Sequence, residues 1–205
     1  FRQGFFINNR EGDITFDYYV TDFKNQVVVD WETQGELSFY NLNGKSFAKS
    51  LQIDFEYQIS DNVLIKSTFK NFDVKKQYVS GFKQNPLTPK NRFFTNIEAS
   101  TNERENGSKW KFDLTYNWIG TQRLTSHTEL VDFDGYSPSY SLLNSQITRE
   151  FSNKLEVYIG GENIGGYTQS NPIIGGDPFG ADFDTSLIYA PIHGALFYLG
   201  LRLKL

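Results

Sequence analysis

The chain has 205 residues, with 20 basic and 24 acidic side chains, so it lacks the strongly basic field of nucleic-acid-binding proteins. Cysteine is absent, which excludes disulfides, thiolate metal sites and thiol catalysis. Aromatic residues make up 17%, which favours strands, and no apolar run is long enough to cross a bilayer as a helix. A membrane barrel is not excluded, because its strands need an apolar residue only at every second position.

Alternation of apolar and polar residues is the strongest pattern along the chain, and it places the apolar side chains on one face of a strand. The first clean case runs from Leu51 to Ile59, where apolar residues alternate with Gln, Asp and Glu. The second runs from Trp110 to Trp118, and the third occupies the end of the chain, from Ala195 to Leu205. Runs this long and regular predict β-strands.

We predict nine strands of the length found in membrane barrels. They are expected near 1–10, 13–31, 36–60, 62–79, 92–103, 109–120, 138–151, 154–164 and 193–205. Asn43-Gly44 offers an alternative, a hairpin turn that would split the third strand. The alternation is clean only beyond this dipeptide, which favours one continuous strand.

The odd number of strands matters because bacterial single-chain barrels close with an even number. An open edge in lipid would also leave backbone groups unpaired. The sequence contains no methionine and no signal peptide. We therefore expect a mature or partial chain, with further strands upstream of Phe1.

The connections between these strands alternate in length. Short turns are predicted at 9–13, 60–62, 104–108 and 152–153, and longer connections near 80–91, 120–138 and 165–192, with 31–36 shorter but on the same side. Short and long connections should therefore lie at opposite ends of the sheet. Outer-membrane barrels have this asymmetry, with short periplasmic turns and long extracellular loops.

The apolar face of such strands contacts either lipid, in a barrel, or a second apolar face, in a soluble sandwich. Three features favour lipid. The strands are long and their polar faces carry charges such as Asp54, Lys111 and Arg202. Tyrosine and tryptophan, which prefer the boundary between dry and wet surroundings, recur near strand ends. The chain also closes on an alternating strand, so we expect an all-β fold, a transmembrane antiparallel β-barrel.

Two segments near the C-terminus resemble TonB-dependent outer-membrane receptors. The stretch 156–172 resembles the penultimate strand and loop of that family, where Glu-Asn-Leu is followed by an aromatic residue and a proline; the matching residues are Glu162, Asn163, Ile164, Tyr167 and Pro172. The segment 191–205 resembles the last strand of these receptors, with agreement at Gly194, Gly200, Leu201, Arg202 and Lys204 and departures at Ala195, Leu203 and Leu205. Segments 18–29 and 41–46 also resemble barrel segments of such receptors.

The resemblance implies that residues 1–205 form the C-terminal portion of a 22-stranded barrel, about nine of its strands, with the plug domain and TonB box outside this chain. It implies an outer-membrane receptor that imports a scarce, bulky ligand, namely a siderophore, a corrinoid, a metal chelate or an oligosaccharide. The implied partners are the TonB complex, the lipid bilayer and this small-molecule or oligosaccharide ligand. A surface lipoprotein is a further candidate partner.

Two other functions stay open at this point. One is a small passive porin or adhesion barrel that is complete in itself, and the other is a soluble β-sandwich binding module. An enzyme is not indicated, because the two histidines, His127 and His193, lie in different long loops and are best interpreted as ordinary loop residues. No cofactor and no metal site are predicted.

The long loops carry the candidate ligand contacts. Acidic residues in 121–138 and 165–192 could attract a cationic ligand or hold Ca²⁺, although solvated charged loops are the interpretation we favour. Aromatic residues there could stack on a ligand ring or pack against one another, and the sequence does not separate these alternatives. The candidate ligand-binding residues are Tyr136, Tyr140, Tyr167, Asp177, Phe179, Asp182 and Asp184.

Overall fold

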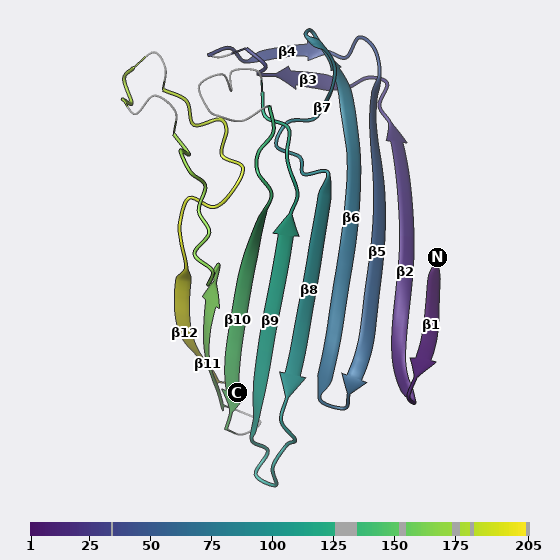
Figure 1. Cartoon of the computed structure of the whole chain (residues 1–205), viewed down its shortest axis with the longest axis vertical. Coiled ribbons are helices and arrows are strands. Elements are labelled where there is room, and N and C mark those ends of the chain that lie inside the picture. Colours follow the sequence, from purple (N-terminus) through teal and green to yellow (C-terminus); the bar gives the residue numbers. More distant parts are fainter. Residues whose placement is uncertain (34, 126–134, 152–154, 174–176, 181–182, 204–205) are drawn as a thin grey trace.

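A computed structural model describes residues 1–33, 35–125, 135–151, 155–173, 177–180 and 183–203 of the protein. Nearly all of its regular structure belongs to one curved antiparallel sheet (Figure 1). The strands are β1 (Arg2–Ile7), β2 (Arg10–Asp22), β3 (Val27–Asp30), β4 (Ser38–Asn41), β5 (Ser46–Ser60), β6 (Val63–Tyr78), β7 (Gly81–Gln84), β8 (Asn91–Ser100), β9 (Lys109–Ile119), β10 (Tyr140–Glu150), β11 (Leu155–Glu162) and β12 (Leu196–Leu203).

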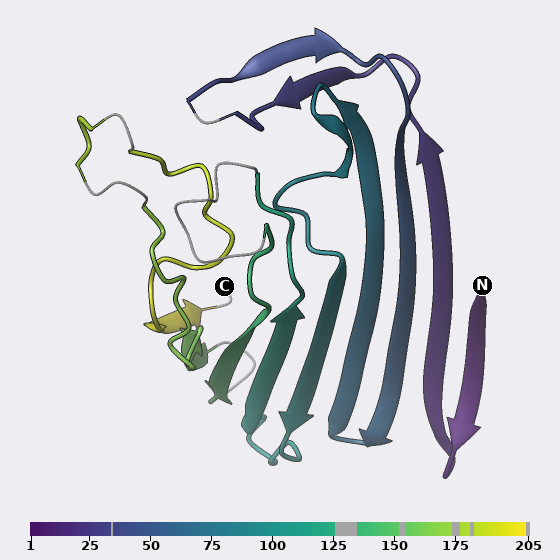
Figure 2. The ribbon, with the colours of Figure 1, turned by 45° about the horizontal axis from the view of Figure 1, so that its top comes forward.

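The main sheet is a meander in which neighbours in sequence are neighbours in space. Its order is β1-β2-β5-β6-β8-β9-β10-β11-β12, and the short strand β7 pairs with β6. This confirms the predicted all-β antiparallel fold, and nine of the ten strands of this sheet correspond to the nine predicted segments. The sheet is open, with β1 at one edge and β12 at the other, and its curvature turns β11 and β12 out of the plane of β5 and β6 (Figure 2).

Two predicted strands are wrong in their extent. The segment predicted as 13–31 ends its strand at Asp22, and the segment predicted as 36–60 begins its long strand only at Ser46. The residues between them form β3 and β4, which pair only with each other in a separate two-stranded sheet. The chain therefore does break around Asn43-Gly44, but not at a hairpin turn, because β4 and β5 belong to different sheets. The alternation of apolar and polar residues does not reveal that residues 27–41 pair with each other instead of continuing the strands of the main sheet.

The long and short connections leave opposite ends of the sheet. Residues 8–9, 61–62, 101–108 and 151–154 join strands at one end, and 23–45, 79–90, 120–139 and 163–195 join them at the other (Figure 1). The β3–β4 hairpin lies at this long-loop end, across the top of the sheet in Figure 2. The short strand β7 occupies part of a segment that alternation had predicted to be loop.

Register gathers the apolar side chains on one face. Because side chains alternate between faces, residues directly opposite each other on neighbouring strands share a face. A single apolar row crosses five strands at Phe16, Ile53, Phe69, Phe93 and Trp118.

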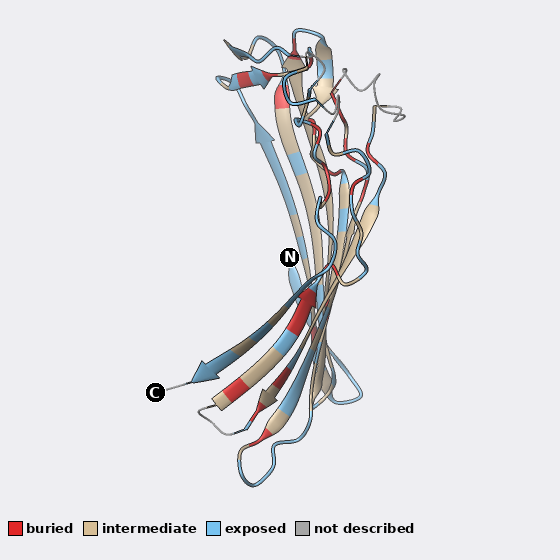
Figure 3. Ribbon diagram, turned by 90° about the vertical axis from the view of Figure 1, so that its left-hand side faces the viewer, coloured by how far each residue is buried: buried red, intermediate tan, exposed pale blue. Residues whose placement is uncertain are grey.

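A second row continues the apolar face to the last strand, through Ala99, Phe112, Ile147, Ile159 and Leu199. Among the described residues nothing covers this face, and the side chain of Leu199 is 75% exposed. Figure 3 shows the sheet edge-on as a single layer over most of its height. In a soluble sandwich this surface would be buried against a second sheet, so the structure argues against that alternative. No helix in the described part of the chain is long and apolar enough to span a membrane.

The opposite face is polar and satisfies its own charges. Asp54 accepts a hydrogen bond from Thr68 at 2.7 Å, and Lys66 forms an ion pair with Glu98 at 3.3 Å. Near the last strand, Arg202 pairs with Glu156 at 3.0 Å. Such cross-strand pairs suit a surface that meets water, whereas the other face suits an apolar solvent.

The last hairpin is held by two reciprocal contacts between an aromatic ring and a glycine. Tyr198 lies directly opposite Gly160, and Tyr158 lies directly opposite Gly200. Each ring covers the glycine so closely that an added Cβ would lie 2.4 Å from the ring of Tyr198 at Gly160 and 2.2 Å from that of Tyr158 at Gly200. The two rings meet edge to face, with centroids 6.3 Å apart. Only glycine leaves room for this arrangement.

Gly160→Ala should therefore reduce folding of the barrel, because the new methyl group displaces the outer end of the Tyr198 ring and breaks its hydrogen bond to Gln146, which costs about 1 kcal/mol. The folded fraction is measured by heat-modifiable migration on a denaturing gel. Gly194→Ala is the matched control, since an added Cβ there meets nothing within 4 Å. Equal folding of both variants would contradict the steric argument.

Candidate functional site

The long loops pack together around a small core of their own. Leu124, Leu187, Tyr189 and Ala190 are buried there and come from two loops that the sequence separates by about sixty residues. Partly buried side chains surround them: Trp31, Leu87, Tyr140 and Tyr167. The loop end is thus a folded unit rather than a set of independent connections.

Two side-chain amides organise this unit. Gln169 accepts hydrogen bonds from the backbone N–H groups of Tyr189 and Ala190 at 2.8 and 3.2 Å, and it donates to the carbonyl of Leu187 at 3.0 Å. Gln122 donates to the carbonyl of Tyr189 at 3.0 Å. Both glutamines are buried, so these bonds replace water for backbone groups that no strand pairing satisfies.

A buried ion cluster joins three of the connections. Glu32, which follows β3 and has a side chain only 4% exposed, pairs with Arg123 through two oxygens and with Lys83 at 3.2 Å. Arg123 also donates to the carbonyl of Gln84 and lies over the ring of Tyr78, 5.7 Å from its centroid. The cluster therefore fastens the β3–β4 hairpin to the 79–90 and 120–139 connections.

The hairpin makes a second attachment beside this cluster. Tyr40 donates to Asp30 at 2.6 Å, and the N–H of Val79 donates to the Tyr40 oxygen at 3.1 Å. Burial, together with the bond to Asp30, raises the pKa of Tyr40 to about 12. Tyr40 therefore stays protonated well above physiological pH and keeps its hydrogen bond to Asp30.

The structure brings two of the predicted site residues together. Tyr140 and Tyr167 do meet, as stacked rings with centroids 5.0 Å apart, whereas Tyr136 is 48% exposed and Phe179 is 98% exposed. Asp177 and Asp184 accept hydrogen bonds from backbone N–H groups two residues further on, within turns. Asp182 and His127 lie outside the described residues.

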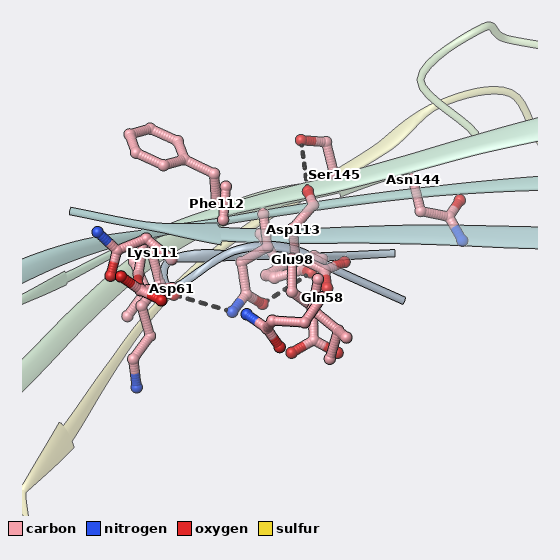
Figure 4. Close-up of a pocket in the computed structure, with 15 residues that line it drawn as sticks. Gln58, Asp61, Glu98, Lys111, Phe112, Asp113, Asn144 and Ser145 are labelled. Carbon is pink, nitrogen blue, oxygen red and sulfur yellow. Dashed lines mark hydrogen bonds between the residues drawn. The ribbon is translucent and has the colours of Figure 1, made fainter. Parts of the chain in front are cut away.

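The described residues contain no group of three or more His, Asp or Glu side chains that could hold a metal ion. His193 lies in the connection between β11 and β12, and its carbonyl accepts a hydrogen bond from Asn163 at 3.2 Å. A hollow of about 500 Å³ lies over the polar face near the short-turn end (Figure 4). Its three carboxylates are engaged, Asp61 with Arg10, Glu98 with Lys66 and Asp113 with Asn96, so it offers no free acid–base pair.

Sequence reasoning missed one pair of cations on the polar face. Lys70 on β6 lies directly opposite Arg92 on β8. Their proximity depends on the register of two strands, which alternation within either strand does not reveal. The only signal in the sequence was the strong excess of lysine and arginine between residues 62 and 97.

Comparison with known proteins shows which solved structures have a similar fold. No protein-family model matches the sequence, and no curated protein matches it. The structure is similar to the ferric-catecholate import receptor Fiu from Escherichia coli K12, with a TM-score of 0.61 at 14% identity over 96% of this chain. It is also similar to BauA, the ferric preacinetobactin receptor from Acinetobacter baumannii, with a TM-score of 0.55 at 13% identity over 94% of the chain.

The chain spans about a quarter of each of these proteins, 26% of Fiu and 28% of BauA. At this level of identity the similarity concerns the fold, and it confirms the predicted likeness to part of a TonB-dependent receptor barrel. Both structural neighbours are receptors rather than enzymes.

Glu32→Ala should loosen the β3–β4 hairpin. It leaves Arg123 and Lys83 without their shared carboxylate, and breaking a buried ion pair costs about 3–5 kcal/mol. Limited proteolysis or hydrogen exchange of residues 23–45 measures the loss. Glu36→Ala removes an exposed glutamate from the same hairpin and should leave protection unchanged. Unchanged protection in Glu32→Ala would show that the cluster does not hold the hairpin.

Proposed function

We propose that this chain is the C-terminal part of the barrel of an outer-membrane receptor that imports a scarce, bulky ligand with energy supplied through TonB. The observation that carries the proposal is the continuous, exposed apolar face across eight antiparallel strands, from β2 to β12. Water would penalise such a surface, whereas hydrocarbon tails solvate it at no cost. The structural likeness to two import receptors supports the same conclusion.

The orientation of the barrel in this proposal follows from the positions of the long connections and of the polar face. The long connections would lie outside the cell, where a ligand arrives, and the polar face would line the aqueous interior. Among the candidate residues, the stacked Tyr140 and Tyr167 and the exposed Tyr136 and Phe179 offer aromatic surface to a ligand. Asp177, Asp182 and Asp184 are weaker candidates, because Asp177 and Asp184 are used in turns.

The other partners of this proposal lie beyond the described residues. TonB would act through parts of the protein outside residues 1–205, and the barrel would close through strands that this sheet does not supply. The ligand belongs to the broad class of siderophores, corrinoids, metal chelates and oligosaccharides. A surface lipoprotein that covers the long-loop end is a further candidate partner.

Leu114→Lys tests whether the apolar face contacts lipid. Leu114 lies midway between Trp110 and Trp118, which are about 26 Å apart along the strand, so its side chain should lie near the bilayer centre. A lysine there should destabilise the barrel by about 2–4 kcal/mol. Urea unfolding in lipid vesicles, followed by tryptophan fluorescence, measures this change.

Thr115→Lys is the matched control, because it adds the same charge one residue away on the polar face. Thr115 accepts a hydrogen bond from Asn96 at 2.9 Å and donates to Asp113 at 3.3 Å, so a lysine there loses the first bond but gains a nearby carboxylate. The net loss of stability should stay within about 1 kcal/mol, well below that of Leu114→Lys. Equal effects of the two lysines would rule out lipid as the solvent of the apolar face.

Energy dependence separates a TonB-dependent receptor from a passive porin. The full-length protein is expressed in cells with and without TonB, and uptake of radiolabelled ferric chelates, cobalamin and oligosaccharides is measured. At least one of these ligands should accumulate only when TonB is present. Uptake that is equal in both strains would support a passive channel instead.

A further inference from the structure

Positive charge is concentrated in one part of an otherwise acidic chain. Between residues 62 and 97 there are seven basic side chains and a single carboxylate, Asp73, whereas the remaining residues carry 13 basic and 23 acidic side chains. This segment comprises β6, β7 and most of β8, next to each other in the middle of the sheet. All of its residues are described by the structure.

Three of these cations are neutralised where they lie. Lys66 pairs with Glu98, Lys75 with Asp73 at 3.1 Å, and Lys83 with the buried Glu32. Lys76 is partly buried and lies over the ring of Tyr78. Their charges therefore have a structural explanation, either a carboxylate or an aromatic face.

The other three, Lys70, Lys90 and Arg92, do not have such an explanation. Lys70 and Arg92 lie directly opposite each other across β6 and β8, on the polar face. Neither makes a hydrogen bond or an ion pair with any residue that the structure describes. Like charges in directly opposite positions destabilise a sheet, so the pair gains stability from any anion that binds between them.

The neighbouring side chains leave this position open to an anion. In the same cross-strand row, Lys70 is flanked by Gln52 and Arg92 is flanked by Ile119, which is followed by Tyr140. The nearest carboxylate in the row, Asp17, lies two strands away from Lys70.

Asp54, one pair further along β5, already accepts hydrogen bonds from Gln52 and Thr68, both at 2.7 Å. It therefore has its own donors and does not need the lysine.

We infer that Lys70 and Arg92 form a binding site for an anionic ligand on the polar face, beside the stacked rings of Tyr140 and Tyr167. The inference rests on the proposed import function and adds the charge of the ligand to it. A guanidinium presents paired donors to clustered oxygens, an ammonium adds a point charge, and the tyrosine stack offers a surface for a planar ring. The ligand class is a compact polyanion with oxygen donors, as found in anionic metal chelates and in acidic oligosaccharides.

Binding to the full-length protein in detergent micelles tests the site with three probes. The Fe(III) tris-catecholate complex is anionic, a Fe(III) tris-hydroxamate complex is a neutral chelate of similar size, and an oligogalacturonate is an acidic sugar. The parent protein should bind one of the two anionic probes more tightly than the neutral chelate, and added salt should weaken this binding. Which anionic probe binds identifies the source of the charge.

The variant is Lys70→Gln combined with Arg92→Gln, and the matched control is Lys75→Gln. The control removes a cation from the same strand, but from the opposite face. Affinity for the anionic probe should fall at least about ten-fold for each cation removed, since a hydrogen bond to a charged group is worth this much. The control should retain parental affinity.

Three results would overturn the inference: parental affinity in the double variant, preference of the parent protein for the neutral chelate, or binding of none of the probes by a correctly folded barrel. A double variant that loses stability but not affinity would show that the cations contact another part of the protein. TonB-dependent uptake is measured in parallel. Import of a neutral or cationic ligand would refute the anion site and leave the receptor function intact.

Discussion

Strand register is the constraint on which the rest of this structure depends. Each strand alternates between apolar and polar side chains, but only a consistent register brings the apolar residues of neighbouring strands to the same face. A shift of one residue at any pairing would place charges such as Lys111 or Asp113 among Phe112 and its neighbours. Nine correctly paired strands instead produce one apolar surface and one polar surface.

The long-loop end is held together mainly by side-chain interactions rather than by strand pairing. Outside the short strands β3, β4 and β7, its connections make little strand pairing, so buried side chains satisfy some of their backbone groups instead. Gln122 and Gln169 bind backbone atoms from distant loops, and Glu32 joins cations from two connections. An ion cluster with such limited exposure stabilises one specific arrangement of the loops, because each charge is costly when its partners leave. A ligand would therefore meet an organised surface.

The charged side chains of the polar face differ in whether they have a partner of opposite charge. Most polar-face charges have a partner within the sheet, as in Arg202 with Glu156 or Lys66 with Glu98. Lys70 and Arg92 stand out because they oppose each other without a carboxylate between them. Because like charges in directly opposite positions destabilise a sheet, this pair is best explained by an anionic group that arrives from outside.

The sequence by itself determined the strand-rich class, the nine long strands and the alternation of short and long connections, since these depend on residues close together in the chain. It did not determine that 27–41 leaves the main sheet, that the loops share a core around Tyr189, or that Lys70 faces Arg92. Those features depend on which distant residues become neighbours. That is decided by register and loop packing, the interactions that an alternating pattern within one strand leaves unspecified.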